Sequence, residues 1–285
     1  MEIAWLSILK AVLILVGIVV LLSLLQFILS VRPPRFYSDN KPLDYGLKYE
    51  DVSFVTKDEM KISAWLIESD KSNGTVIIGH GYPFDKGNVL PVAKFLYPDY
   101  NLLFYDHGYF GESEGKMTTV GLREVLDVEA AVEFVRERMG ENESIGLYGF
   151  SLSASAMIMA RPRVNAIVSD SAYADLGNLV RHVYRIFGPL KYPFVWMTNL
   201  YSKVFFGKFP SEISSANALR GYDVPVLVIY GEKDSQIPIE NAYELKQSNS
   251  NVELWIVEGA DHGQAYAFNK REYEKRIKTF LSKNM

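Results

Sequence analysis

The first thirty residues have a different hydrophobic pattern from the rest of the chain. Residues Ala11 to Val31 carry no charge, and an apolar helix of this length reaches about 30 Å, the thickness of a membrane's hydrocarbon layer. We therefore expect a single-pass transmembrane anchor over residues 1–31. A cleaved signal peptide is the alternative, but it requires a shorter apolar region and a small-x-small cleavage site, whereas this run ends in LQFILSVRPP.

A proline-rich linker is predicted next, over residues 32–48. Its prolines end any helix, so the chain leaves the membrane there. Basic residues after the span outnumber those before it, and the positive-inside rule then places the following part of the chain in the cytoplasm. These residues are Arg32, Arg35, Lys41 and Lys48, against Lys10 before the span.

Strand patterns dominate the remainder, residues 49–285. DVSFVTKDEMKISAWLIES alternates around a charged turn and predicts a β-hairpin with one buried face. Short continuous apolar runs follow, which are typical of strands buried on both faces: TVIIGHG, NLLFYDHG, SIGLYGFS, VNAIVSDS, PVLVIYGEKD and VELWIVEGADH. Helical patterns such as GLREVLDVEAAVEFVRERMG lie between several of them. The alternation predicts an α/β fold with a mostly parallel sheet, helices on both faces, and ligands bound beyond the carboxyl ends of the strands.

One connection, at about 177–222, is too long for this alternation and is rich in aromatic residues. We expect an inserted lid, because long connections in compact domains tend to be functional. Two ordinary helices packed on the sheet are the alternative. The aromatic side chains would suit a lipid interface, with basic side chains at the headgroups. The basic residues are Arg181, Arg185, Lys191, Lys203 and Lys208.

Composition excludes several classes of protein. The chain of 285 residues is 48% hydrophobic, which suits one large domain with a closed core. Its net charge of −4 argues against a nucleic-acid partner. It has no cysteine, which excludes disulfides and thiolate chemistry, and its four histidines lack the paired spacing of a metal site.

Two serines compete for the role of nucleophile. Ser113 lies in a perfect GxSxG, GESEG, but the preceding strand ends seven positions earlier and glutamates flank the serine. Ser151 lies in GFSLS, where Ser153 replaces the second glycine. The strand SIGLYG runs directly into Ser151 and a helical stretch follows at once, as a nucleophile on a strand-turn-helix requires. We therefore predict Ser151 as the nucleophile.

A serine nucleophile needs a base and an acid that orients the base. His262 follows the last predicted strand and Asp234 follows the strand before it, so both belong at the same edge of the sheet as Ser151. Asp170, Asp261 and Asp175 are alternative acids.

The oxyanion hole needs two backbone N–H donors. We predict that Leu152, directly after the nucleophile, and Tyr82, in the loop IIGHGYPF, supply them. In that loop, we expect His80 to hold the backbone together rather than to act in catalysis.

These motifs resemble those of the α/β-hydrolase superfamily. HGYPFDKGN is similar to its oxyanion loop, and YDHGYFGESEG resembles its D-x-R-G-x-G-x-S-x-G loop, with Gly108 and Tyr109 where arginine and glycine are expected. GFSLSA, GEKDSQIP and GADHGQ resemble the nucleophile elbow, the acid turn and the histidine loop. The resemblance implies an α/β-hydrolase fold and a serine hydrolase mechanism without a cofactor. It also implies that Ser113 is a non-catalytic loop serine.

The function expected is hydrolysis of small-molecule or lipid esters by a carboxylesterase held at a lipid bilayer. A serine peptidase or amidase on the same scaffold is one alternative. A non-catalytic, membrane-anchored binding protein is another, because some members of the superfamily catalyse nothing.

Overall fold

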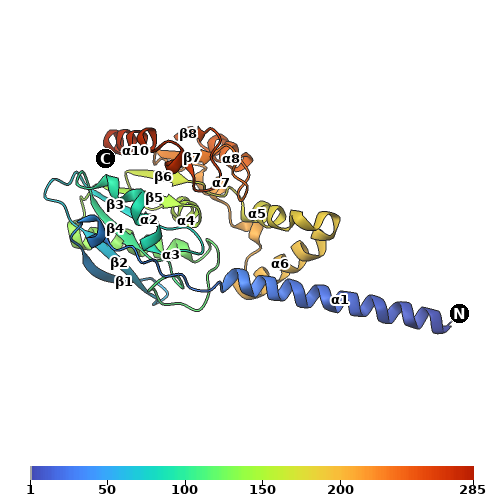
Figure 1. Ribbon diagram of the computed structural model, residues 1–285. Coiled ribbons are helices and arrows are strands. Elements are labelled where there is room, and N and C mark those ends of the chain that lie inside the picture. The colour runs from blue at the N-terminus through green and yellow to red at the C-terminus, as the bar shows by residue number, and fades with distance from the viewer. Residues whose placement is uncertain (1) are drawn as a thin grey trace. The chain divides into compact units, whose positions relative to one another are not determined.

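The computed structural model describes residues 2–285, with side-chain surroundings from Trp5 onward, and they form two compact units (Figure 1). One unit combines the N-terminal residues through Pro33 with Leu176–Ile213. The other combines Pro34–Asp175 with Ser214–Met285 and contains the whole sheet.

The sheet has eight strands in the order β1-β2-β4-β3-β5-β6-β7-β8. The pairs β1–β2 and β2–β4 are antiparallel, and the other neighbouring pairs are parallel. The predicted hairpin therefore forms one edge of an otherwise parallel sheet. The strands are β1 (Glu50–Val55), β2 (Lys61–Ile67), β3 (Thr75–Gly79), β4 (Asn101–Tyr105), β5 (Ile145–Phe150), β6 (Ala166–Asp170), β7 (Val226–Gly231) and β8 (Val252–Val257).

Helices cover both faces of the sheet, which confirms the predicted fold. Every residue of β3, β4, β6 and β7 is buried, as continuous apolar runs require. On one face, α2, α9 and α10 share a hydrophobic core with the strands, and α3, α4, α7 and α8 cover the other face. Their bounds are α2 (Lys86–Ala93), α3 (Glu124–Met139), α4 (Leu152–Ala160), α7 (Ser215–Leu219), α8 (Glu240–Ser248), α9 (Ala265–Phe268) and α10 (Lys270–Asn284), with 3-10 turns η1 (Pro42–Tyr45) and η2 (Lys94–Leu96).

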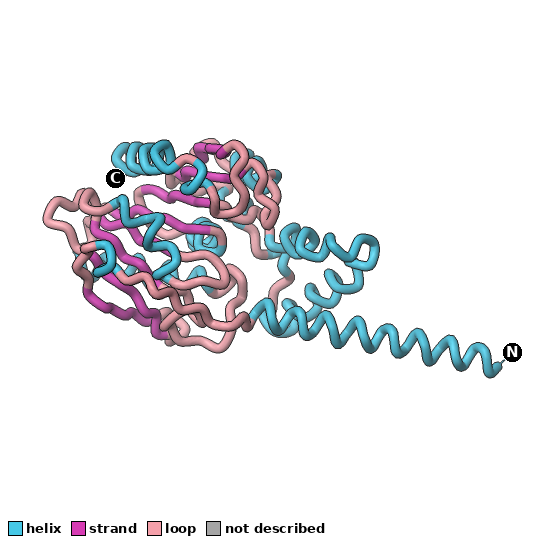
Figure 2. Tube along the Cα trace, viewed as in Figure 1, coloured by secondary structure: helices cyan, strands magenta, loops and turns pink. Residues whose placement is uncertain are grey.

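The unit that contains the N-terminal residues and Leu176–Ile213 is built of helices alone (Figure 2). Its longest element, α1, begins before the predicted apolar run, because Lys10 is itself a good helix former and lies inside the helix. Residues Trp5–Val31 of α1 are long and apolar enough to cross a membrane. The helices are α1 (Glu2–Val31), α5 (Leu176–Val183) and α6 (Lys191–Phe206), with 3-10 segments η3 (Tyr184–Leu190) and η4 (Pro210–Glu212).

Candidate active site

Ser151 stands at a sharp turn between β5 and α4. β5 ends at Phe150, α4 begins at Leu152, and Ser151 itself has φ 52° and ψ −105°. A positive φ is strained in a residue with a Cβ atom, and such strain is concentrated at functional sites. The helix backbone passes close to the strand here: a Cβ atom at Gly149 would lie 2.5 Å from the backbone nitrogen of Ala154. Glycine is therefore required at 149, and the tight crossing supports the strained serine.

The loops after β7 and β8 bring two further side chains to Ser151. Its Oγ lies 3.1 Å from Nε2 of His262, and Nδ1 of His262 lies 2.8 Å from Oδ2 of Asp234. The other carboxylate oxygen of Asp234 accepts hydrogen bonds from the backbone N–H groups of Gln236 and Ile237, at 3.0 and 2.8 Å. The side chains of His262 and Asp234 are both buried. The structure thus joins the three residues of the predicted triad in one hydrogen-bonded chain.

The carboxylate of Asp234 selects the tautomer of His262. A carboxylate only accepts hydrogen bonds, so Nδ1 of the imidazole carries a proton and Nε2 is left to accept from the hydroxyl of Ser151. This arrangement can withdraw the serine proton as the oxygen attacks an electrophilic carbon. Among the side chains that the structure describes, from Trp5 to Met285, no group of three or more His, Asp and Glu residues could hold a metal ion.

Two alternative acids are engaged elsewhere. The carboxylate of Asp170 accepts a hydrogen bond from the hydroxyl of Tyr273 at 2.6 Å, and burial raises the pKa of Asp170. Asp261 accepts the backbone N–H of His262 at 2.7 Å. Asp234 is therefore the carboxylate that lies against Nδ1 of the imidazole.

His80 holds the loop after β3 in place. Its Nδ1 donates to the carbonyl oxygen of Gly81 at 2.9 Å, and its Nε2 accepts the backbone N–H of His107 at 3.0 Å. Burial lowers the pKa of His80 to about 4, so the ring is neutral at pH 7. A Cβ atom at Gly81 would lie 2.6 Å from the ring of Phe150, so the loop passes against the turn at Ser151. His80 therefore has a structural role in the loop that continues into Tyr82.

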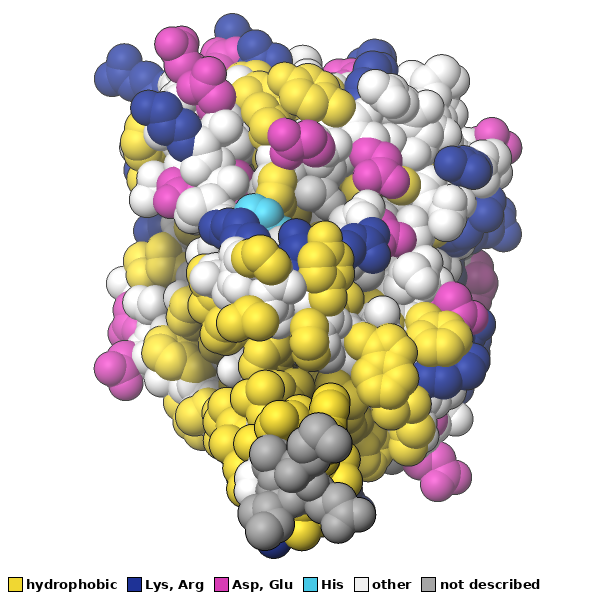
Figure 3. Space-filling model, turned by 90° about the vertical axis from the view of Figure 1, so that its right-hand side faces the viewer, with side chains coloured by type: hydrophobic (Ala, Val, Ile, Leu, Met, Phe, Trp, Pro, Cys, Tyr) yellow, Lys and Arg dark blue, Asp and Glu magenta, His cyan; other side chains and the backbone are white. Residues whose placement is uncertain are grey.

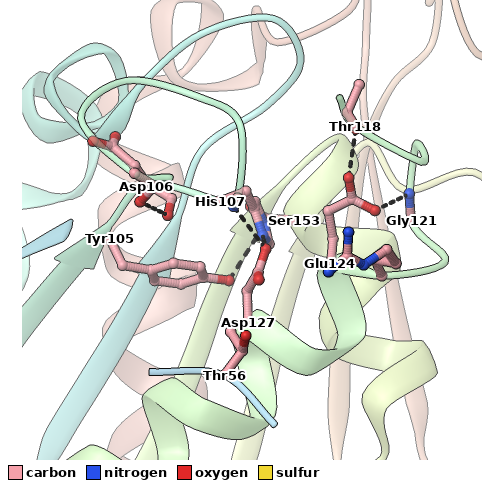
Figure 4. Close-up of polar contacts among 12 residues, drawn as sticks. Thr56, Tyr105, Asp106, His107, Thr118, Gly121, Glu124, Asp127 and Ser153 are labelled. Carbon is pink, nitrogen blue, oxygen red and sulfur yellow. Dashed lines mark hydrogen bonds and ion pairs between the residues drawn. The ribbon is translucent and has the colours of Figure 1, made fainter. Parts of the chain in front are cut away.

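A second chain of serine, histidine and aspartate lies buried beside the same turn (Figure 4). Oγ of Ser153 is 2.7 Å from Nε2 of His107, whose Nδ1 is 2.9 Å from Asp127. The hydroxyl of Ser153 also donates to the carbonyl oxygen of His80 at 2.5 Å. All of these side chains are buried, so no substrate reaches them. The chain ties α4 to α3 and to the loops after β3 and β4. In the sequence, Ser153 was recognised only as a replacement of the second glycine of the motif. No pattern among neighbouring residues indicated that His107 pairs with Asp127.

Ser113, in the perfect GxSxG match, is buried. Its hydroxyl donates to the backbone carbonyl of Asp106 at 2.7 Å and accepts the backbone N–H of Ser63 at 2.9 Å. These bonds fasten the loop after β4 to strand β2. The serine motif that a pattern search would select is therefore a structural element.

Similar proteins cover most of this chain. The Pyrococcus furiosus esterase Pf2001 superposes with a TM-score of 0.74 and is 30% identical, covering 90% of this chain and 98% of that one. The uncharacterized protein YqkD of Bacillus subtilis is 27% identical over 233 residues, which are 77% of this chain and 75% of that protein. The uncharacterized membrane protein YNL320W of Saccharomyces cerevisiae is 23% identical over 207 residues, 69% of this chain and 66% of that protein.

The family model of the X-Pro dipeptidyl-peptidases (S15 family) matches residues 84–203. This stretch contains Ser151 but ends before Asp234 and His262. The fold, the strand-turn-helix at Ser151 and the similarity to an esterase along almost its whole length lead to one conclusion. This chain belongs to the α/β-hydrolase superfamily.

Proposed function

We propose that this protein is a membrane-anchored serine hydrolase that cleaves carboxylic esters. The observation that carries the proposal is the hydrogen-bonded chain from Ser151 through His262 to Asp234, with the serine on a strained turn. The 30% identity with an esterase from Pyrococcus furiosus supports an ester as the substrate.

In the proposed mechanism, Oγ of Ser151 attacks the carbonyl carbon while Nε2 of His262 takes the hydroxyl proton. The backbone N–H groups of Leu152 and Tyr82 stabilise the negative charge on the carbonyl oxygen. The C–O bond to the alcohol then breaks, and the alcohol leaves with the proton from His262. Water, deprotonated by His262, attacks the acyl-enzyme, and the carboxylic acid departs as the proton returns to Ser151.

The anchor proposed is α1, with the following chain in the cytoplasm. A stretch of 18 residues within Trp5–Val31 has a mean hydropathy of 3.1, and the yeast relative is described as a membrane protein. The excess of basic residues after the helix supports the orientation. The unit that contains the sheet, called the hydrolase unit below, should then be degraded by protease added to sealed inverted vesicles. Protection from protease in these vesicles would place that unit on the opposite side of the membrane.

An acyl or lipid-like ester is the preferred substrate class. The aromatic residues of the inserted segment, proposed as a lid over about 177–222, support this choice. The second candidate is a peptidase or amidase, which the S15 family match over residues 84–203 favours. Both share the acyl-enzyme, but a peptidase must protonate an amine leaving group.

Labelling with a fluorophosphonate probe tests the mechanism. We expect wild type and Ser113→Ala to be labelled and Ser151→Ala not to be labelled, because only an activated serine reacts. Labelling lost in Ser113→Ala alone would refute the assigned nucleophile, and a well-folded wild type that does not react would refute a serine hydrolase.

Initial rates on p-nitrophenyl esters of increasing chain length, compared with rates on X-Pro p-nitroanilides, distinguish a lipid-like ester, a short ester and an X-Pro peptide as substrates.

A further inference from the structure

Helix α6 carries a row of exposed hydrophobic side chains. Residues four apart lie next to one another on a helix, so Tyr192, Trp196, Leu200 and Val204 form one inclined stripe. Trp196 is 64% exposed and Val204 is 68% exposed. Exposing such a stripe to water is unfavourable, and a contiguous apolar surface of this kind marks an interaction site.

The segment before α6 extends this surface. Val183, at the end of α5, and three residues of η3 are exposed as well: Ile186, Phe187 and Leu190. Hydrophobic side chains also gather around the apolar helix in the space-filling view (Figure 3). We refer to these four residues and the α6 stripe together as the apolar surface of the inserted segment.

Another side of α6 packs against the C-terminal part of α1. The buried ring of Phe27 on α1 is surrounded by three aromatic rings of α6, with centroids 5.5 Å away for Tyr201, 5.8 Å for Phe205 and 5.7 Å for Phe206. These contacts hold α6 alongside the candidate membrane span.

Polar groups at this contact between α1 and α6 form hydrogen bonds with one another. The hydroxyl of Tyr201 donates to the carbonyl oxygen of Val20 at 3.1 Å and lies 3.2 Å from Oγ of Ser23, which is fully buried. Pairing of hydroxyl groups between helices in this way suits an environment without water.

The position of this contact along α1 sets the depth of α6. At 1.5 Å per residue, the candidate span of 27 residues is about 40 Å long, which matches a bilayer with its headgroup layers. Phe27 then lies about 6 Å, and Val20 about 16 Å, from the end of α1 at Val31. A helix packed along this stretch lies among the headgroups and the adjoining acyl chains whenever α1 spans the membrane.

We propose that the apolar surface of the inserted segment is embedded in the leaflet that surrounds the C-terminal end of α1. The inference rests on the membrane anchoring in the proposed function, and the occupant of the surface is lipid. Charge supports this choice, because Leu176–Ile213 contains a single carboxylate side chain, Glu212, and several basic ones that suit anionic headgroups. The basic residues are Arg181, Arg185, Lys191, Lys203 and Lys208.

The absence of cysteine from the chain permits a direct test with single labels. Val204→Cys and Val55→Cys form a matched pair, because both valines are similarly exposed, at 68% and 62%, and Val55 belongs to strand β1 of the hydrolase unit. Leu13→Cys, in the middle of α1, reports on the anchor. Each full-length variant is labelled with nitrobenzoxadiazole, reconstituted into vesicles that contain anionic lipid, and exposed to lipids with a doxyl quencher on the acyl chain.

We expect the labels at 204 and 13 to be blue-shifted and quenched by the lipid, and the label at 55 to be quenched only by iodide in the buffer. A quenched label at 13 with a label at 204 that responds only to iodide would overturn the embedding and leave the anchor intact. Labels at 13 and 204 that both escape lipid quenching would refute the anchor and the embedding together. A label at 204 shielded from both quenchers, with disulfide-linked dimers of unlabelled Val204→Cys, would assign the surface to a second copy and overturn the proposal.

Discussion

The guanidinium group of Arg35 donates a hydrogen bond to the carbonyl oxygen of Ser113 over 2.9 Å. It also donates to the carbonyl oxygens of Gly111 at 3.2 Å and Gly115 at 3.1 Å, and it lies 5.2 Å from the centre of the Tyr109 ring. An arginine of the predicted linker therefore fixes the loop after β4. The superfamily pattern expects an arginine within that loop itself.

The variant Arg35→Lys tests this fastening. Lysine keeps the charge but loses the planar fork that reaches several carbonyl groups, so we expect the free energy of unfolding to fall by about 1–2 kcal/mol. Denaturant titration of the full-length protein in detergent micelles measures the change. The matched control is Arg32→Lys at an exposed position, which should stay within about 0.5 kcal/mol of wild type. Equal effects of the two variants would contradict a specific role for Arg35.

The buried chain at Ser153 makes a second prediction. Ser153→Ala leaves the carbonyl oxygen of His80 and Nε2 of His107 without their serine partner, which we expect to cost about 1–3 kcal/mol of stability. The loop that leads to Tyr82 becomes less firmly held. The rate constant kcat should therefore fall, but by less than the roughly 100-fold loss typical of deleting an oxyanion donor.

Fluorophosphonate labelling and esterase kinetics, together with denaturant titration, measure both effects of Ser153→Ala. The variant should still be labelled, because Ser151 remains. Complete loss of labelling in a folded Ser153→Ala protein would show that the nucleophile had been assigned to the wrong serine of GFSLS.

The choice of acid is testable by comparing two asparagine variants. Asp234→Asn can donate to Nδ1 of His262, which favours the wrong tautomer, and we expect kcat to fall by roughly 10³–10⁴. In Asp170→Asn, the group bonded to Tyr273 changes instead, so the expected loss is mainly in stability. The burst of p-nitrophenol gives the concentration of active sites. Dividing the steady-state rate by this concentration separates a fall in kcat from a loss of folded protein. A larger fall in kcat for Asp170→Asn would reverse the assignment.

Stability should depend on pH through His80. Its pKa is about 4 in the folded protein and 6.5 in a free side chain, so between pH 4 and pH 6.5 the unfolded chain binds more protons than the folded protein does. The contribution of neutral His80 to the free energy of unfolding is therefore complete above pH 6.5. It is lost as the pH falls through about 4, a change of roughly 3 kcal/mol. Unfolding free energies of wild type and His80→Gln, measured from pH 7 to pH 4, test this expectation. Wild type should lose more stability than the variant, and parallel curves would rule His80 out as the cause.

Much of the fold was predictable because its signals are local. Continuous apolar runs such as TVIIG and VLVIYG require burial on both faces, and all of their residues are buried in β3 and β7. The direct passage from strand to helix at Ser151 was likewise readable from neighbouring residues. The limits of the anchor, linker, hydrolase domain and lid stay predictions, as do the catalytic roles of Ser151, Asp234, His262, Tyr82 and Leu152.

The sequence by itself determined the order of strands and helices, the apolar α1 and the strand ends that carry Ser151, Asp234 and His262. Only the tertiary structure decided which acid meets His262, how the hydroxyl of Ser113 is engaged, and that His107 joins Asp127. The same is true of the contact between Phe27 and Tyr201. The physical reason is range: strand and helix patterns follow from adjacent residues, whereas these contacts join distant parts of the chain and depend on how the elements pack.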